Sequence, residues 1–145
     1  MGEGIYGAVS YYPDSDDQVY LIGGDYSWQL RDVNQLFFQF EYLDDGAMII
    51  NSLLGGIDLE TEERNRLLVG MINYELDDFS SLQLNTTYSL DDGSLMLAPG
   101  YSNQVASNLD FEINGGFFIG DEGELFGSGG RIPQRMVEVK FSYPF

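Results

Sequence analysis

The chain has 145 residues, a length that suits one domain, and its 24 acidic and six basic residues give a formal charge of −18 at pH 7. Such a charge repels the phosphate backbone and excludes nucleic acid as a partner. Cysteine and histidine are both absent, which removes disulfides, thiolate metal sites and the usual general base near neutral pH. The content of 43% hydrophobic and 14% aromatic residues is too high for a disordered acidic chain.

Apolar and polar residues alternate in repeated stretches along the chain. Successive side chains of a strand point to opposite faces, so each stretch predicts a strand with one apolar side. In chain order the stretches are residues 5–12, 19–30, 36–42, 68–76, 82–90, 95–102, 109–119 and 135–145. Each is close to the roughly 9–11 residues with which a tilted strand crosses a bilayer. We therefore expect an all-β fold: an antiparallel up-and-down transmembrane β-barrel of about eight strands, with residues 1–145 as a single domain.

The connections between these stretches alternate in length. Longer breaks at residues 12–19, 43–66 and 120–134, with a tight turn at 91–93, alternate with shorter links at 31–34, 77–80 and 102–108. Bacterial barrels have short periplasmic turns and longer external loops, and an even strand number places both termini in the periplasm. The pattern predicts that both ends of this chain are periplasmic.

Aromatic residues gather toward the ends of the predicted strands. Amphipathic rings favour a membrane interface, so we expect two aromatic girdles. The periplasmic girdle would contain Tyr26, Trp28, Tyr74 and Tyr101, and the outer girdle Tyr11, Tyr20, Tyr42 and Tyr88.

The last predicted strand carries a family resemblance. Val139, Phe141, Tyr143 and Phe145 share one uncharged face. The ending Tyr143-Pro144-Phe145 resembles the carboxy-terminal sorting signal of Gram-negative outer-membrane proteins, which the barrel-assembly machinery recognises. Residues 88–99 and 117–123 are similar to the last strands of large porin-like outer-membrane proteins, and the resemblance is clearest over residues 67–145.

This resemblance implies a bacterial outer-membrane location, with membrane lipid, lipopolysaccharide and the barrel-assembly machinery as partners. It also suggests a carboxy-terminal portion of a longer barrel. The start, Met1-Gly2-Glu3-Gly4, has no basic segment followed by an apolar core, so we expect no signal peptide in this chain. No apolar run approaches the roughly 18 residues of a membrane-spanning helix. We expect a monomer.

The polar sides of the predicted strands define a candidate lumen. An eight-stranded barrel has an interior just wide enough for side chains, so we expect a filled, structural barrel without a cofactor. The lumen cluster would consist of Asp25, Glu41, Glu75, Asp110, Glu112, Glu138 and Lys140. One alternative is a segment of a larger porin or channel, with the excess carboxylates lining a cation path. Another is a soluble, lipocalin-like ligand-binding barrel, because alternation does not distinguish inside from outside.

Catalysis and metal binding have weak candidates. Glu112 and Glu138 are the only pair suited to glycoside hydrolysis, and no sugar fits a narrow lumen, so we expect no enzyme. The carboxylates of Asp14, Asp16 and Asp17 suit calcium or magnesium, but the spacing does not match an EF-hand, and we interpret them as a solvated loop without metal. The apolar insert at 47–57 is compatible with a lumen cap, an interfacial helix or a contact surface.

Overall fold

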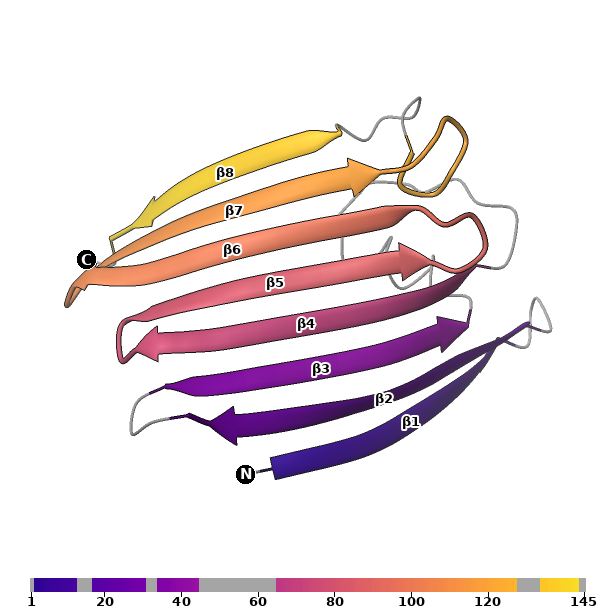
Figure 1. The fold of residues 1–145 in the computed structure, drawn as a ribbon, viewed down its shortest axis with the longest axis horizontal. Helices are drawn as coiled ribbons and strands as arrows, with labels where there is room; N and C mark the ends of the chain where they lie inside the picture. The colour runs from indigo at the N-terminus through magenta and orange to yellow at the C-terminus, as the bar shows by residue number, and fades with distance from the viewer. Residues whose placement is uncertain (1, 13–16, 31–33, 45–64, 128–133, 144–145) are drawn as a thin grey trace.

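The computed structural model describes residues 2–12, 17–30, 34–44, 65–127 and 134–143, although not the side chains of Tyr12 and Asp17. They form eight strands in one sheet (Figure 1). The strands are β1 (Gly2–Tyr12), β2 (Asp17–Gln29), β3 (Gln35–Asp44), β4 (Arg66–Asp77), β5 (Ser80–Ser89), β6 (Leu95–Ala106), β7 (Leu109–Ile119) and β8 (Arg135–Ser142). The described parts of the chain contain no helix long and apolar enough to cross a membrane.

Each strand pairs antiparallel with its neighbours in sequence, in the order β1 to β8. The all-β, up-and-down arrangement of eight strands that the alternation predicts is therefore confirmed. The C-terminal ends of β1, β3, β5 and β7 lie at one end of the sheet, which we call the loop end. The C-terminal ends of β2, β4 and β6 and the N-terminal end of β1 lie at the opposite end, which we call the turn end (Figure 1).

The predicted closure into a barrel is not observed. Among the described residues β1 pairs only with β2 and β8 only with β7, so both are edge strands of an open sheet. Figure 1 shows these two strands at opposite margins of the sheet. Alternation specifies which face a side chain occupies, but it carries no information on whether the two edge strands meet.

The register places the apolar parity of all eight strands on one side, which we call the apolar face. One row across the sheet, followed through consecutive strand pairs, contains Ile22, Tyr42, Leu68, Tyr88, Leu95 and Ile119. A second row contains Trp28, Leu36, Tyr74, Leu82, Tyr101, Ile113 and Val139. The opposite side, which we call the polar face, carries the other parity of every strand.

The buried core lies at the loop end of the polar face. Leu43 and Leu67, which are cross-strand neighbours, form a cluster with Leu125 and Phe126 from the β7–β8 connection. Phe126 and Leu67 are completely buried. Leu21, Val69, Met96 and Phe118 pack against this cluster from the same face. The side chains of the polar face are therefore mostly apolar at the loop end, whereas they are mostly polar in the middle of the face and toward the turn end.

Candidate functional site: the two faces of the sheet

Large hydrophobic side chains of the apolar face are exposed on strands from β1 to β8. Ile5 is 91% exposed, Val137 71% and Phe141 67%, and Ile22 and Phe40 in the interior of the sheet each retain more than half of their surface. A contiguous apolar surface of this kind marks a contact with lipid or with another protein.

Charge is confined to the margins of the apolar face. Among the described residues, the charged side chains with this parity are Glu3, Asp44, Arg66 and Arg135. Each lies within two residues of a strand end, and Asp44 and Arg66 are direct cross-strand neighbours at the loop end. The central span of the face therefore presents no charge.

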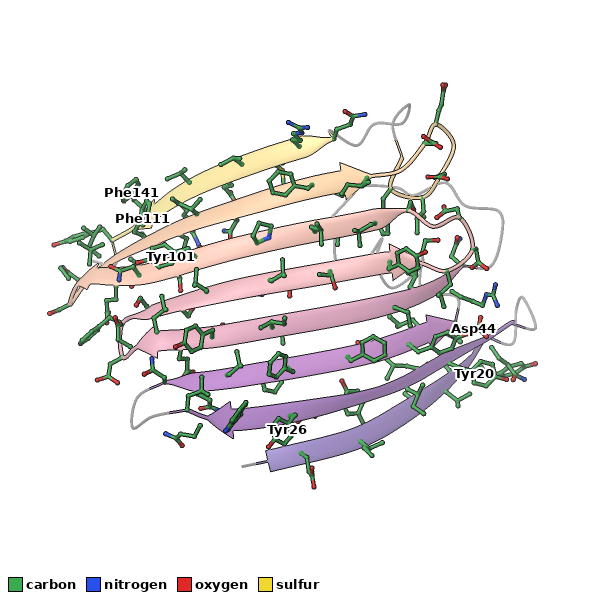
Figure 2. The ribbon with its side chains drawn as sticks, in the orientation of Figure 1. Tyr20, Tyr26, Asp44, Tyr101, Phe111 and Phe141 are labelled. Atoms are coloured by element: carbon green, nitrogen blue, oxygen red, sulfur yellow. The ribbon has the colours of Figure 1, made fainter. Side chains whose placement is uncertain are left out.

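The expected aromatic girdle residues lie on the apolar face near both ends. Tyr74 and Tyr101 flank Leu82 in the row that contains Trp28, toward the turn end. Tyr42 and Tyr88 share a row near the loop end, and Tyr20 and Tyr11 lie farther out on β2 and β1. Figure 2 shows Tyr20 and Asp44 near the loop end and Tyr101 near the turn end. Their role at a membrane interface stays a prediction.

A hollow of about 870 Å³ interrupts the middle of the apolar face. Gly24 and Gly70 flank Phe40 in one cross-strand row that continues to Thr86, and the two glycines leave space on either side of the Phe40 ring. Aromatic and aliphatic side chains surround it, including Tyr26, Phe38, Phe40, Ile72 and Leu84. Glu3, Asp25 and Gln39 contribute polar groups to the same lining, so the hollow is mostly but not entirely apolar.

Polar side chains on the polar face form cross-strand hydrogen bonds. The Tyr6 hydroxyl donates to Glu41 Oε1 at 2.7 Å, and Gln39 Nε2 donates to both Tyr6 and Glu41. The Tyr6–Glu41 hydrogen bond links β1 to β3 across β2. It can form because Gly23, which lies between Tyr6 and Glu41 in the register, has no side chain. A Cβ on Gly23 would approach the Tyr6 ring and Glu41 Cγ to 2.8 Å.

The seven residues of the expected lumen cluster share the polar face, but they do not form one cluster. Asp25, Glu41 and Glu75 lie on β2, β3 and β4, whereas the others lie on β7 and β8. Lys140 donates to Glu112 at 3.4 Å, and Glu138 faces Asn114. Strands lie about 4.8 Å apart, so β5 and β6 separate the two groups by roughly 14 Å in the sheet. Period-two alternation specifies the face that each side chain occupies, but not its distance from other side chains across the sheet.

The residues of the predicted carboxy-terminal signal lie partly within the described chain. Val139 pairs with Ile113, and Phe141 lies against Phe111 with ring centroids 4.9 Å apart. Figure 2 shows this ring pair at the turn end. Tyr143 follows β8 and is exposed, whereas Phe145 lies outside the described residues. The insert at 47–57 and the candidate ligands Asp14 and Asp16 also lie outside them, and the Asp17 side chain is not described.

No group of three or more carboxylates suited to a metal ion occurs among the residues that the structure describes. The glycoside-hydrolysis candidates lie on adjacent strands, with Glu112 opposite Lys140 and Glu138 opposite Asn114, two register pairs away. Both side chains lie on the polar face, near the β8 edge of the sheet.

The β7–β8 connection departs from the expected external loop. Residues 120–127, which we call the folded segment, lie against the polar face at the loop end. The alternation of connection lengths predicts a long external loop at residues 120–134. The apolar pair Leu125-Phe126, between Gly123 and Gly127, is the sequence feature that indicates burial of this segment.

Asp92, in the β5–β6 turn, connects to the folded segment. Its Oδ2 accepts the Leu125 N–H at 2.6 Å, and its Oδ1 accepts the N–H and hydroxyl of Ser94. Burial alone would raise the pKa of Asp92, but the hydrogen bonds from Leu125 and Ser94 outweigh burial and lower the pKa below its ordinary value. The carboxylate is thus held ionised by the contacts that it makes.

No protein-family model, curated protein or solved structure matches this chain. The resemblance to outer-membrane proteins therefore stands on the residues and motifs of the sequence alone.

Proposed function

We propose that the sheet is a sector of the wall of an outer-membrane β-barrel that forms a channel, with the apolar face toward lipid and the polar face toward the lumen. The observation that carries this proposal is the separation of charge by face. The central span of the apolar face has no charge among the described residues, while Asp25, Glu41 and Glu112 all lie on the other side. A barrel wall in a bilayer requires this distribution on every strand.

A barrel of more than eight strands fits better than a small filled one. The interior of an eight-stranded barrel is just wide enough for its own side chains. Here the polar face already carries Tyr6, Phe118 and Gln39, and the folded segment adds a further layer that includes Phe126. The open margins at β1 and β8 expose backbone groups that need partners in a membrane, so further strands would pair there.

The partners follow from the same proposal. Lipid would cover the apolar face, with lipopolysaccharide at the loop end, and the barrel-assembly machinery would insert the chain through β8. Val139 and Phe141, both on the apolar face of β8, would belong to the recognised signal. The chain would have no catalytic role.

The single tryptophan tests which face contacts lipid. Trp28 lies on the apolar face and is 46% exposed. In vesicles that contain brominated phosphatidylcholine we expect strong quenching of Trp28 fluorescence, because bromine quenches only on contact. The matched control is Trp28→Phe with Phe37→Trp, which moves the reporter to the polar face of β3, where we expect little quenching.

A soluble, lipocalin-like protein would behave differently. It would stay folded and monodisperse in buffer without detergent, and it would leave Trp28 unquenched. Equal quenching at positions 28 and 37 would also overturn the assignment of the faces.

A further inference from the structure

We infer that the folded segment is anchored on the polar face by Asp92 and Ser94 and there limits the size of solutes that pass along that face. The inference deepens the proposed function and rests on it, because it takes the polar face as the lining of a passage. The segment itself and its anchoring residues belong to the described structure.

Two polar contacts join the folded segment to the β5–β6 turn. The N–H groups of Leu125 and Phe126 are consecutive donors, and they bond to Asp92 Oδ2 at 2.6 Å and to Ser94 Oγ at 3.1 Å. Ser94 is completely buried and its hydroxyl donates to Asp92 at 2.7 Å. A charge-assisted acceptor therefore fixes the segment from a different hairpin, about 30 residues away in the sequence.

Apolar packing continues the attachment across the sheet. The segment leaves β7, yet its Leu125 and Phe126 cluster with Leu43 of β3 and Leu67 of β4. The spacing of strands makes β7 and β4 about 14 Å apart, so the segment spans a large part of the polar face. It covers the loop end, where any passage along this face would open.

The shape of the segment depends on glycines at its ends. A Cβ on Gly120 would lie 2.9 Å from Ser94 Cβ and 3.1 Å from Gly127 Cα. A Cβ on Gly127 would overlap the carbonyl oxygen of Asp121. The two ends are thus in close approach, and the segment is a compact loop with its own closure rather than a chain lying by chance on the sheet.

The first test measures the anchoring and does not require a pore. The chain has no cysteine, so Leu125→Cys introduces a single thiol, which can be labelled with a polyethylene-glycol maleimide in detergent micelles. We expect slow labelling in this variant because the position is buried. Adding Asp92→Asn replaces an acceptor oxygen and should raise the labelling rate by roughly tenfold. Ser94→Ala, which removes the acceptor of the Phe126 N–H, should also raise it.

Asp91→Asn is the matched control on the same turn. The Asp91 carboxylate bonds to Arg66 and not to the folded segment, so labelling should stay within about twofold of the parent. Unchanged Trp28 emission in all variants would show that the sheet is retained. Equal labelling in the Asp91 and Asp92 variants would overturn the anchoring.

The second test measures passage in planar bilayers. We expect Asp92→Asn and Gly127→Ala to increase single-channel conductance and the size limit for neutral polymers, while Asp91→Asn leaves both unchanged. Faster labelling without a change in conductance would show that the segment is anchored as inferred, but would overturn the inference that it limits the size of solutes. Absence of conductance in every variant, together with unquenched Trp28 fluorescence, would overturn the proposed function. The labelling rates would still show whether Asp92 and Ser94 anchor the folded segment.

Discussion

At the residue scale, individual hydrogen-bond acceptors and a glycine decide the local structure. Asp92 gathers donors from its own turn and from the folded segment, while its neighbour Asp91 holds Arg66 through the guanidinium and the backbone N–H. Gly23 permits the Tyr6 hydroxyl to reach Glu41 across β2. Adjacent residues of similar chemistry thus have different structural roles, which depend on the element that faces each one.

The lowered pKa of Asp92 predicts how acid affects the folded segment. A carboxyl group whose pKa is depressed in the folded state stabilises that state above its ordinary pKa of 3.8 and loses this contribution as the pH falls through the folded value. Attachment of the segment should therefore be constant from neutral pH to about pH 4 and weaken below it. Asp91 is the nearest other carboxylate on this turn, and it is paired with Arg66.

A tryptophan at position 118 measures this transition. Phe118 contacts Phe126 of the segment, with ring centroids 6.5 Å apart, so Phe118→Trp in a Trp28→Phe chain reports detachment by a shift of its emission to the red. Adding Asp92→Asn should remove the acid transition. A transition that persists in this variant would assign it to another group.

At the scale of elements, β8 has a weaker attachment than the inner strands. Within the part of the chain that the structure describes, it pairs with β7 alone, over Arg135–Ser142, and most of its side chains are exposed. The Phe111–Phe141 ring pair is its main side-chain contact on the apolar face. Val137, on the same face, lies opposite Gly115 and has no cross-strand side chain to meet.

We predict that Phe141→Ala destabilises the sheet more than Val137→Ala. Cross-strand aromatic pairs contribute about 0.5–1.5 kcal/mol beyond the area that they bury. The free energy of unfolding in lipid vesicles, measured with urea, should fall by about 1 kcal/mol more for Phe141→Ala. Equal losses would mean that the ring pair has no special contribution, and a larger loss for Val137→Ala would contradict the prediction.

At the scale of the whole molecule, charge is distributed unevenly between the faces. The side chains of Asp25, Glu41, Glu75, Asp110, Glu112 and Glu138 on the polar face accompany Lys140 as the single cation of that set. A surface with this excess of carboxylates concentrates cations near it. A channel with this lining should prefer cations to anions.

The reversal potential in a potassium chloride gradient across a planar bilayer measures this preference. We expect potassium to be favoured over chloride by a few-fold at low salt, with the preference declining as salt increases. Asp25→Asn with Glu75→Gln should reduce it, while Glu3→Gln, which removes a carboxylate from the apolar face, should not. Anion preference, or an equal effect of Glu3→Gln, would contradict the assigned lining.

The sequence by itself determined the eight strands, their antiparallel order and the face of each side chain. Period-two alternation is a local property, and turn lengths make neighbours in sequence pair in the sheet. Trp28 and Tyr101, for example, belong to the same face on parity alone.

The tertiary structure alone decided that β1 and β8 do not pair, that Glu112 and Glu41 lie in separate groups, and that residues 120–127 fold onto the polar face. Each of these depends on distances between strands far apart in the sequence. Parity does not encode such distances, because the curvature of a sheet and the docking of a loop arise from packing among many residues at once.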